Sequence, residues 1–305
     1  MENINKELSI IYGDVTLGLK GDDFHYIFSY AKGGLESLKK QGQEWLYRIP
    51  MPTFWRATTD NDRGNGFSYA SAMWMGADMF LRCISKYVKI NGEEIPFPAA
   101  PENNKYSNNE NAKEVEITFI YETSTVPKTS VSVSYTVLPS GEIKIHMHYK
   151  GKDNLPGLPV LGMRFVLMEK ADGYKYEGLS GETYPDRMEG GAYGVHQVEG
   201  LPVTPYLVPQ ECGMHMKTRW AEVERNNQSI KFRGKDEFAF SCLPYTSQEL
   251  ENATHMEELP LPRRTVMVIA NKVRGVGGID SWGSKPGKDY EIPGDQDYTL
   301  QFSVK

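Results

Sequence analysis

The sequence predicts a mainly β protein built as a large antiparallel sandwich, and three observations support this fold class. Several segments alternate apolar and polar residues with a period of two, which is typical of strands with one buried face. Eighteen prolines and 29 glycines are spread along the 305 residues without a repeat, as expected for turns between many short strands. Helical periodicity is sparse. We therefore expect one large β-domain over residues 1–305, although length alone would suggest two domains.

The clearest strand signals lie in the middle of the chain. Residues 115–121 form one alternating set, and residues 131–137 and 143–149 repeat the pattern on either side of a Pro-Ser-Gly turn at 139–141. Two alternating runs joined by a short turn predict a β-hairpin. Further strands are expected at 238–240, 266–269 and 298–304.

Two short helices are expected as excursions from the sheets. Apolar residues recur at i, i+3, i+4 and i+7 between Ala70 and Phe80, and Ser68 could serve as the N-cap. A second helix is expected after Thr246, because Glu249 follows it in the register of a capping box. The polar tract at 103–111 is the most loop-like segment and is interpreted as a surface insertion.

The charge pattern argues against two classes of partner. The formal net charge is −6, and acidic and basic residues are interleaved without a long basic run, which disfavours a nucleic-acid groove or an anionic membrane surface. Charged Glu2, Lys6 and Asp14 stand where the apolar core of a signal peptide would lie, and no apolar window approaches 18 residues. We expect a cytoplasmic protein with no nucleic-acid or membrane partner.

Cysteines and histidines give no metal or disulfide signature. Cys83, Cys212 and Cys242 are widely spaced and odd in number, so we interpret them as reduced packing residues. His146 and His148 have a spacing that could chelate a metal from one sheet face. They are expected to point outward, however, and the sequence supplies no third ligand.

Two pairs of carboxylates are candidates for the acid–base chemistry of glycoside hydrolysis, which usually needs two carboxyl groups about 5 to 9.5 Å apart. The pairs are Asp60 with Asp62 and Glu182 with Asp186. In loops, such side chains more often cap turns, accept backbone hydrogen bonds or pair with neighbouring arginines. We therefore predict a structural role for both pairs.

Trp282 is expected on a loop, because Gly277 and Gly278 precede it and Gly283 follows it. An aromatic plane on a loop can stack against the C–H face of a sugar, and burial as a packing residue is the alternative. The glycine cluster at 275–278 lacks the Lys-Ser/Thr ending of a phosphate loop, so we expect a tight turn there.

Three ordered motifs together resemble one known family. They are FWRATTDNDRG at 54–64, ETYPDR at 182–187 and GGIDSW at 277–282. Over nearly its whole length the chain resembles the C-terminal domain of the large bacterial β-galactosidases, of the glycoside hydrolase family 2 type, which some bacteria encode as a separate small subunit. The resemblance implies a galactose-mutarotase-like sandwich. It also implies that the two catalytic glutamates lie on a TIM-barrel domain. This chain is too short to contain that barrel as well as the sandwich, because a barrel needs about 250 residues of its own.

The resemblance further implies roles for individual residues. Trp282 corresponds to an aromatic platform at the edge of the galactoside site, where it contacts the leaving-group or acceptor sugar. Gly64 corresponds to a hinge in a movable loop beside the active site, and the residues that shape this loop are Asp60, Asn61, Asp62 and Arg63. No catalytic residue and no metal ligand is expected on this chain.

The partner and activity are implied in the same way. A large catalytic subunit is expected to carry the two glutamates and any Mg²⁺ or Na⁺, and the assembled enzyme to hydrolyse terminal β-D-galactosides such as lactose with retention of configuration. The chain alone is expected to be inactive. The alternatives are a stand-alone enzyme like an aldose 1-epimerase, and a non-catalytic carbohydrate-binding module.

Overall fold

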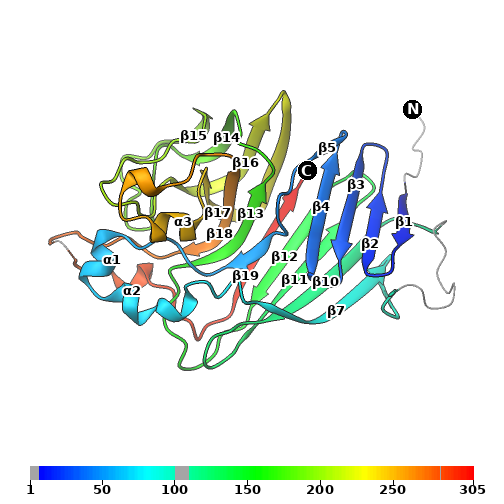
Figure 1. Ribbon diagram of the computed structural model, residues 1–305, viewed down its shortest axis with the longest axis horizontal. Coiled ribbons are helices and arrows are strands. Elements are labelled where there is room, and N and C mark those ends of the chain that lie inside the picture. The colour runs from blue at the N-terminus through cyan, green and yellow to red at the C-terminus, as the bar shows by residue number, and fades with distance from the viewer. Residues whose placement is uncertain (1–6, 100–109, 282) are drawn as a thin grey trace.

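The computed structural model describes residues 7–99, 110–281 and 283–305. Among these residues the strands form two sheets, and every strand pairing is antiparallel. Figure 1 shows the N-terminal sheet on one side of the molecule, packed across the long strands of the larger sheet. The expected mainly β, antiparallel fold is confirmed.

The smaller sheet has six strands in the order β5-β4-β3-β2-β1-β9. Five of its strands are consecutive in the sequence, so short turns account for most of the connections. Its strands are β1 (Leu8–Tyr12), β2 (Thr16–Lys20), β3 (Phe24–Ser29), β4 (Gly34–Lys40), β5 (Gln43–Glu44) and β9 (Glu110–Ala112). The sequence predicts a loop at 103–111. Residues 103–109 lie outside the described residues, whereas Glu110 and Asn111 belong to β9, so the prediction is wrong for these two.

The larger sheet has 13 strands within the described ranges. Its main path is β15-β14-β16-β17-β19-β12-β11-β10-β7-β8, and β13, β18 and β6 pair beside this path. Its strands are β6 (Met51–Thr53), β7 (Arg82–Ile90), β8 (Glu93–Ile95), β10 (Val115–Glu122), β11 (Ser130–Val137), β12 (Ile143–Tyr149), β13 (Val160–Leu167), β14 (Gly173–Leu179), β15 (Tyr193–Glu199), β16 (Met214–Arg225), β17 (Gln228–Leu243), β18 (Thr265–Val273) and β19 (Tyr298–Val304). All the strands expected from alternation are present.

The predicted hairpin is formed by β11 and β12. Val133 pairs with Met147 across it, and the buried positions alternate along both strands as the sequence pattern requires. The turn contains Gly141 at a φ of 79°, a left-handed conformation that glycine adopts readily. His146 is exposed and His148 half-buried on the solvent side, as predicted.

The two sheets share one apolar core, which makes the arrangement a sandwich. Phe28 of the smaller sheet packs against Tyr135 of the larger one, with ring centroids 5.5 Å apart. The Tyr26 hydroxyl crosses the same interface and donates a 2.7 Å hydrogen bond to the Gly141 carbonyl. Because both inner faces are buried, burial of apolar surface between the sheets is the main stabilising contribution.

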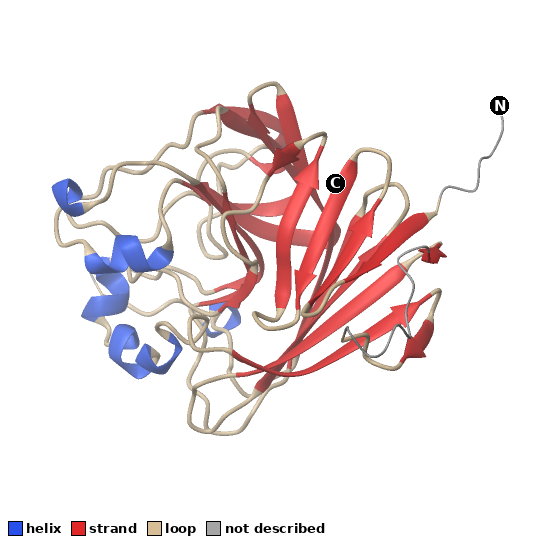
Figure 2. Ribbon diagram, turned by 45° about the vertical axis from the view of Figure 1, so that its right-hand side comes forward, coloured by secondary structure: helices blue, strands red, loops and turns tan. Residues whose placement is uncertain are grey.

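Short helices gather at one end of the larger sheet (Figure 2). The α-helices are α1 (Asp60–Gly64), α2 (Phe67–Ala70) and α3 (Ser247–Asn252), and the 3-10 turns are η1 (Ala72–Trp74), η2 (Met256–Glu258) and η3 (Lys288–Tyr290). Helix α3 begins after Thr246 with the predicted capping box.

The other helix prediction is wrong in detail. The segment between Ala70 and Phe80 is not one helix, and the N-cap of α2 is Gly66, not Ser68. Met75 is extended and Gly76 has a φ of 72°, so the backbone leaves the helical region after Trp74. The helix-like apolar spacing therefore arises because Trp74 and Ala77 are both buried in the core, although the backbone between them is not one helix.

Candidate functional site

The three motifs singled out in the sequence converge at the end of the larger sheet. The first contains α1, the second follows β14, and the third follows β18. The Asn61 side-chain amide donates to the Val276 carbonyl at 3.1 Å, and the Asp186 carboxylate accepts from the Val276 amide at 2.9 Å. A turn of helix, a loop and a glycine-rich segment, far apart in the sequence, thus form one polar cluster.

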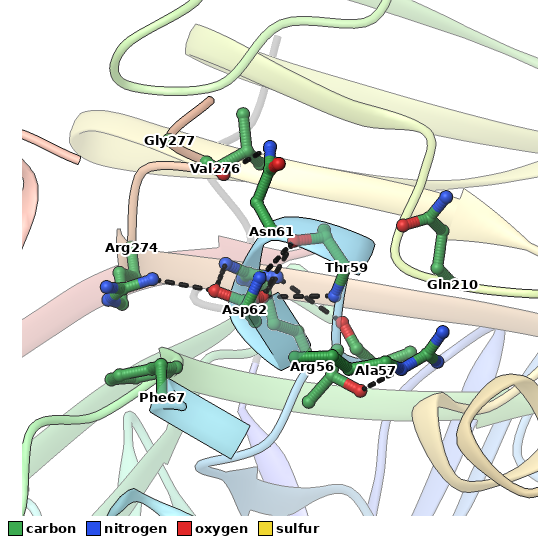
Figure 3. Close-up of polar contacts among 12 residues, drawn as sticks. Arg56, Ala57, Thr59, Asn61, Asp62, Phe67, Gln210, Arg274, Val276 and Gly277 are labelled. Carbon is green, nitrogen blue, oxygen red and sulfur yellow. Dashed lines mark hydrogen bonds and ion pairs between the residues drawn. The ribbon is translucent and has the colours of Figure 1, made fainter. Parts of the chain in front are cut away.

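Asp62 is the centre of this cluster and is 1% exposed. It forms ion pairs with Arg56 at 2.8 Å and with Arg274 at 2.7 Å. It also accepts hydrogen bonds from the backbone and the hydroxyl of Thr59, both at 3.0 Å. Thr59 is the N-cap of α1, and the reciprocal bonds make a capping box. Figure 3 shows Asp62 between the two arginines and the cap.

The first motif is therefore helical only at its end, over Asp60–Gly64, and irregular before it, and the predicted structural role of Asp62 is confirmed. Its carboxylate neutralises one of two buried guanidinium groups, since Arg56 and Arg274 are both 2% exposed. Arg274 also lies over the Phe67 ring, with its guanidinium carbon 3.6 Å from the centroid. The Nε atoms of both arginines have no hydrogen-bond partner among the described residues. Two buried positive charges thus share one negative charge, and removing that carboxylate would be strongly destabilising.

Asn61 points away from Asp62 and holds the third motif (Figure 3). Besides its bond to Val276, its side-chain oxygen accepts from the Gly283 amide at 3.2 Å. The fit is tight: a Cβ on Gly278 would lie 2.4 Å from the Asn61 amide nitrogen, and one on Gly64 would lie 3.1 Å from the Gly283 Cα. The segment that flanks position 282 is thus anchored directly to α1.

The second motif anchors the same segment from the other side. The two carboxylate oxygens of Asp186 accept from the amides of Val276 and Gly277 at 2.9 and 2.8 Å. Arg187 donates to the Gly277 carbonyl. The predicted structural role of Asp186 is confirmed by these bonds. The glycine cluster at 275–278 has Gly277 and Gly278 at positive φ but is irregular backbone and not a tight turn, so that expectation is wrong.

Asp60 and Arg63 are the surface members of α1. Their ion pair is 3.4 Å long and both side chains are partly exposed, 52% and 32% respectively. The Arg63 Nε also donates to the Thr58 hydroxyl at 3.1 Å. The predicted hinge at Gly64 remains a prediction. Trp282, the residue singled out for sugar stacking, lies outside the described residues.

A cavity of about 430 Å³ lies beside α1. Tyr184, Gln210 and Glu211 form its buried part, while Asp60 and Glu182 are exposed on its rim. Burial raises the pKa of Glu211 to about 8 against the opposing effect of Arg56. Glu211 therefore holds a proton over much of the neutral range, close enough to buried Arg56 and Asp62 for both charges to act on it.

Sequence reasoning missed Arg274, Gln210, Glu211 and the hydroxyl of Tyr184 as members of the site. Arg274 follows β18 and Glu211 precedes β16, and neither belongs to a pattern with a chemical meaning. Only their convergence in space reveals them. Among the residues that the structure describes, no group of three or more His, Cys, Asp or Glu side chains could hold a metal ion. Nor is any described helix long and apolar enough to span a membrane.

The fold and the site define a mainly β protein in which three distant motifs assemble one polar surface at a sheet end. The chain matches the model of the family described as beta galactosidase small chain over residues 20–304. It belongs to that family.

Two relatives show how the chain compares in length. It is 56% identical to the beta-galactosidase small subunit of Latilactobacillus sakei, over 100% of this chain and 99% of that protein. It is 34% identical to a beta-galactosidase of Halalkalibacterium halodurans, over 99% of this chain and 28% of that protein. The chain therefore spans the whole of one relative and about a quarter of the other.

Among solved structures, the chain is similar to galactose 1-epimerase from Lactobacillus acidophilus, with a TM-score of 0.47, 7% identity and 98% of each chain covered. A galactose mutarotase-like protein from Lactobacillus casei gives a TM-score of 0.44 and 12% identity, over 95% of this chain and 99% of that one. We carry no residue role over from either protein.

Proposed function

We propose that this chain is the small subunit of a heterodimeric β-galactosidase of the glycoside hydrolase family 2 type. It completes the galactoside site of a large subunit that carries the acid/base and nucleophile glutamates. The observation that supports this most directly is how much of each of two relatives the chain covers. The chain corresponds to all of a protein named as a small subunit and to about a quarter of a longer β-galactosidase.

The state of the carboxylates agrees with catalysis by a partner. Asp62 is occupied by two ion pairs and two hydrogen bonds from its own cap. Asp186 is occupied by two backbone amides. Neither is available to protonate a leaving group or to attack an anomeric carbon. Asp60 and Glu182 are therefore each left without the second carboxylate of the pair considered from the sequence.

In the assembled enzyme we assign this chain a positioning role. The surface around α1 and the segment ending at Gly283 faces the large subunit's galactoside site, and Trp282 supplies a stacking plane for the leaving-group or acceptor sugar. The reaction is hydrolysis of terminal β-D-galactosides such as lactose with retention of configuration, in the cytoplasm. Any Mg²⁺ or Na⁺ is held by the large subunit.

The test is hydrolysis of nitrophenyl-β-galactoside by this chain alone, by a purified large subunit alone, and by the two mixed. We expect activity only in the mixture. Hydrolysis by this chain alone would contradict the proposal and would direct attention to Glu182 and Glu211, which share the cavity. Accelerated mutarotation of α-D-galactose by the chain alone, measured by polarimetry, would favour the epimerase alternative.

A further inference from the structure

The cavity beside α1 has features of a small-molecule site that the positioning role does not use. Its volume of about 430 Å³ lies within the range of roughly 300–1,000 Å³ typical of ligand sites. Residues from the first two motifs line it, together with Val276, which precedes the third motif, and Tyr206, Gln210 and Glu211 from the segment before β16. A rigid frame surrounds it, because Asn61, Asp62 and Asp186 tie these segments together.

The hydroxyl of Tyr184 is the most informative atom. Tyr184 lines the cavity and is 5% exposed, yet its hydroxyl has no hydrogen-bond partner among the described residues. Burial raises its pKa well above 10, and the neighbouring carboxyl groups of Glu211 and Glu182 raise it further. Both carboxyl groups belong to the cavity wall. A buried hydroxyl without a partner is destabilising, and a ligand hydroxyl that reached it from the cavity would remove that penalty.

The remaining polar groups supply both donors and acceptors. The Gln210 side-chain oxygen accepts from the Asp60 amide at 2.9 Å, which leaves its NH₂ group, unpaired among the described residues, free to donate; Figure 3 shows Gln210 beside the start of α1. Glu182 is held by a 2.6 Å bond from the Thr204 hydroxyl, and a carboxylate can accept further bonds. Tyr206 is half-buried and adds an aromatic ring.

The geometry points to this cavity as a binding site for one neutral hexose unit, with Tyr184, Glu182 and Gln210 contacting its hydroxyl groups. Vicinal hydroxyls both donate and accept, which matches a wall of mixed donors and acceptors with an aromatic ring. The choice of a hexose among neutral polyols rests on the proposed function. A protonated Glu211 at the base adds a hydrogen-bond donor to this wall.

The test measures galactose and glucose binding to the full chain by titration calorimetry and saturation-transfer NMR at pH 7. Tyr184→Phe removes the hydroxyl and keeps the ring, and we expect it to weaken hexose binding about tenfold, the equivalent of one lost hydrogen bond. Tyr135→Phe is the matched control. The Tyr135 hydroxyl is also buried without a partner among the described residues, but it lies in the sandwich core, so hexose binding should not change.

The outcomes separate this site from the proposed function. Equal binding by wild type and Tyr184→Phe overturns the site even if the mixed subunits hydrolyse galactosides. Binding of Mg²⁺ alone with no hexose binding also overturns it, in favour of a cation site. If the mixed subunits are inactive but Tyr184→Phe selectively loses hexose, the site stands and the subunit assignment fails.

Discussion

The Asp62 carboxylate lies 2.7 Å from the guanidinium group of Arg274, although the two residues are 212 positions apart. This ion pair links α1 to the segment that leaves β18 and continues to position 283. Arg56 forms a second ion pair with the same carboxylate at 2.8 Å. Because all three groups are buried, the position of α1 depends on an interaction that water cannot replace.

We expect Asp62→Asn to destabilise the chain by about 3–5 kcal/mol, because it leaves two buried guanidinium groups without their countercharge. The free energy of unfolding from urea titration measures this change. Asp60→Asn is the matched control on the same helix, and since its pair with Arg63 is partly exposed, its effect should stay below about 1 kcal/mol. A loss for Asp62→Asn as small as that of the control would contradict the role given to the buried cluster.

Contact between Gly278 and Asn61 gives a second prediction. Gly278→Ala places a methyl group 2.4 Å from the Asn61 amide nitrogen, so the Asn61 side chain must shift and its bonds to Val276 and Gly283 are weakened. Gly181 has the same φ of 72°, but a methyl group there would meet nothing within 4 Å. Gly181→Ala therefore carries the backbone strain alone, and Gly278→Ala should lower the free energy of unfolding by about 1–2 kcal/mol more.

A double variant tests the cause of that difference. Combining Gly278→Ala with Asn61→Ala removes the group that the new methyl would meet, so the two effects should not add. Additive losses in urea titrations would show that the methyl group is strained by something other than Asn61.

Glu211 gives a prediction about pH. Its pKa rises from the ordinary 4.5 to about 8 in the folded chain, so the folded state binds the proton more tightly than the unfolded state. The stability contributed by the protonated form is fully present below pH 4.5 and is lost as the pH rises toward 8. Relative to Glu211→Gln, wild type should therefore lose stability across this window, by at most about 1.4 kcal/mol per pH unit.

Urea titrations of both proteins between pH 4 and pH 9 measure this difference. A constant difference over the window would show that Glu211 titrates alike in the folded and unfolded chains. A difference that grows in the opposite direction would mean that Arg56, not burial, dominates the pKa of Glu211.

Much of the fold could be predicted from the sequence, because strand alternation reports burial directly. The set at 115–121 and the hairpin of β11 and β12 follow from a period of two and one turn. The helix between Ala70 and Phe80 could not be predicted correctly, since Trp74 and Ala77 reach the core from a broken backbone whose spacing imitates a helix. Tertiary packing thus overrides a local pattern.

The candidate site was likewise predictable in part. The three motifs were recognisable because they combine residue types that core packing alone would not select. Their convergence was not recognisable, because the link depends on Arg274 and Glu211, which belong to no motif and become meaningful only beside Asp62 and Arg56. A buried charge cluster depends on which distant segments the fold brings together, so it cannot be predicted from local sequence patterns.

Trp282 gives the prediction that bears on activity. In the enzyme assembled with a large subunit, Trp282→Ala should impair lactose hydrolysis and galactosyl transfer to a sugar acceptor, because stacking of one sugar on an aromatic ring is lost. Steady-state kinetics with lactose and transfer assays with added glucose measure both activities. Trp220→Ala is the control, since Trp220 is a partly exposed tryptophan on β16 that stacks with Lys231.

The neighbours of position 282 make this readout specific. Gly283 is bonded to Asn61 and Gly277 to Asp186, so the segment has its own anchors, and truncating the indole should leave α1 in place. Unchanged lactose kinetics would therefore remove Trp282 from the site, whereas equal losses in the Trp282 and Trp220 variants would indicate a general effect on assembly.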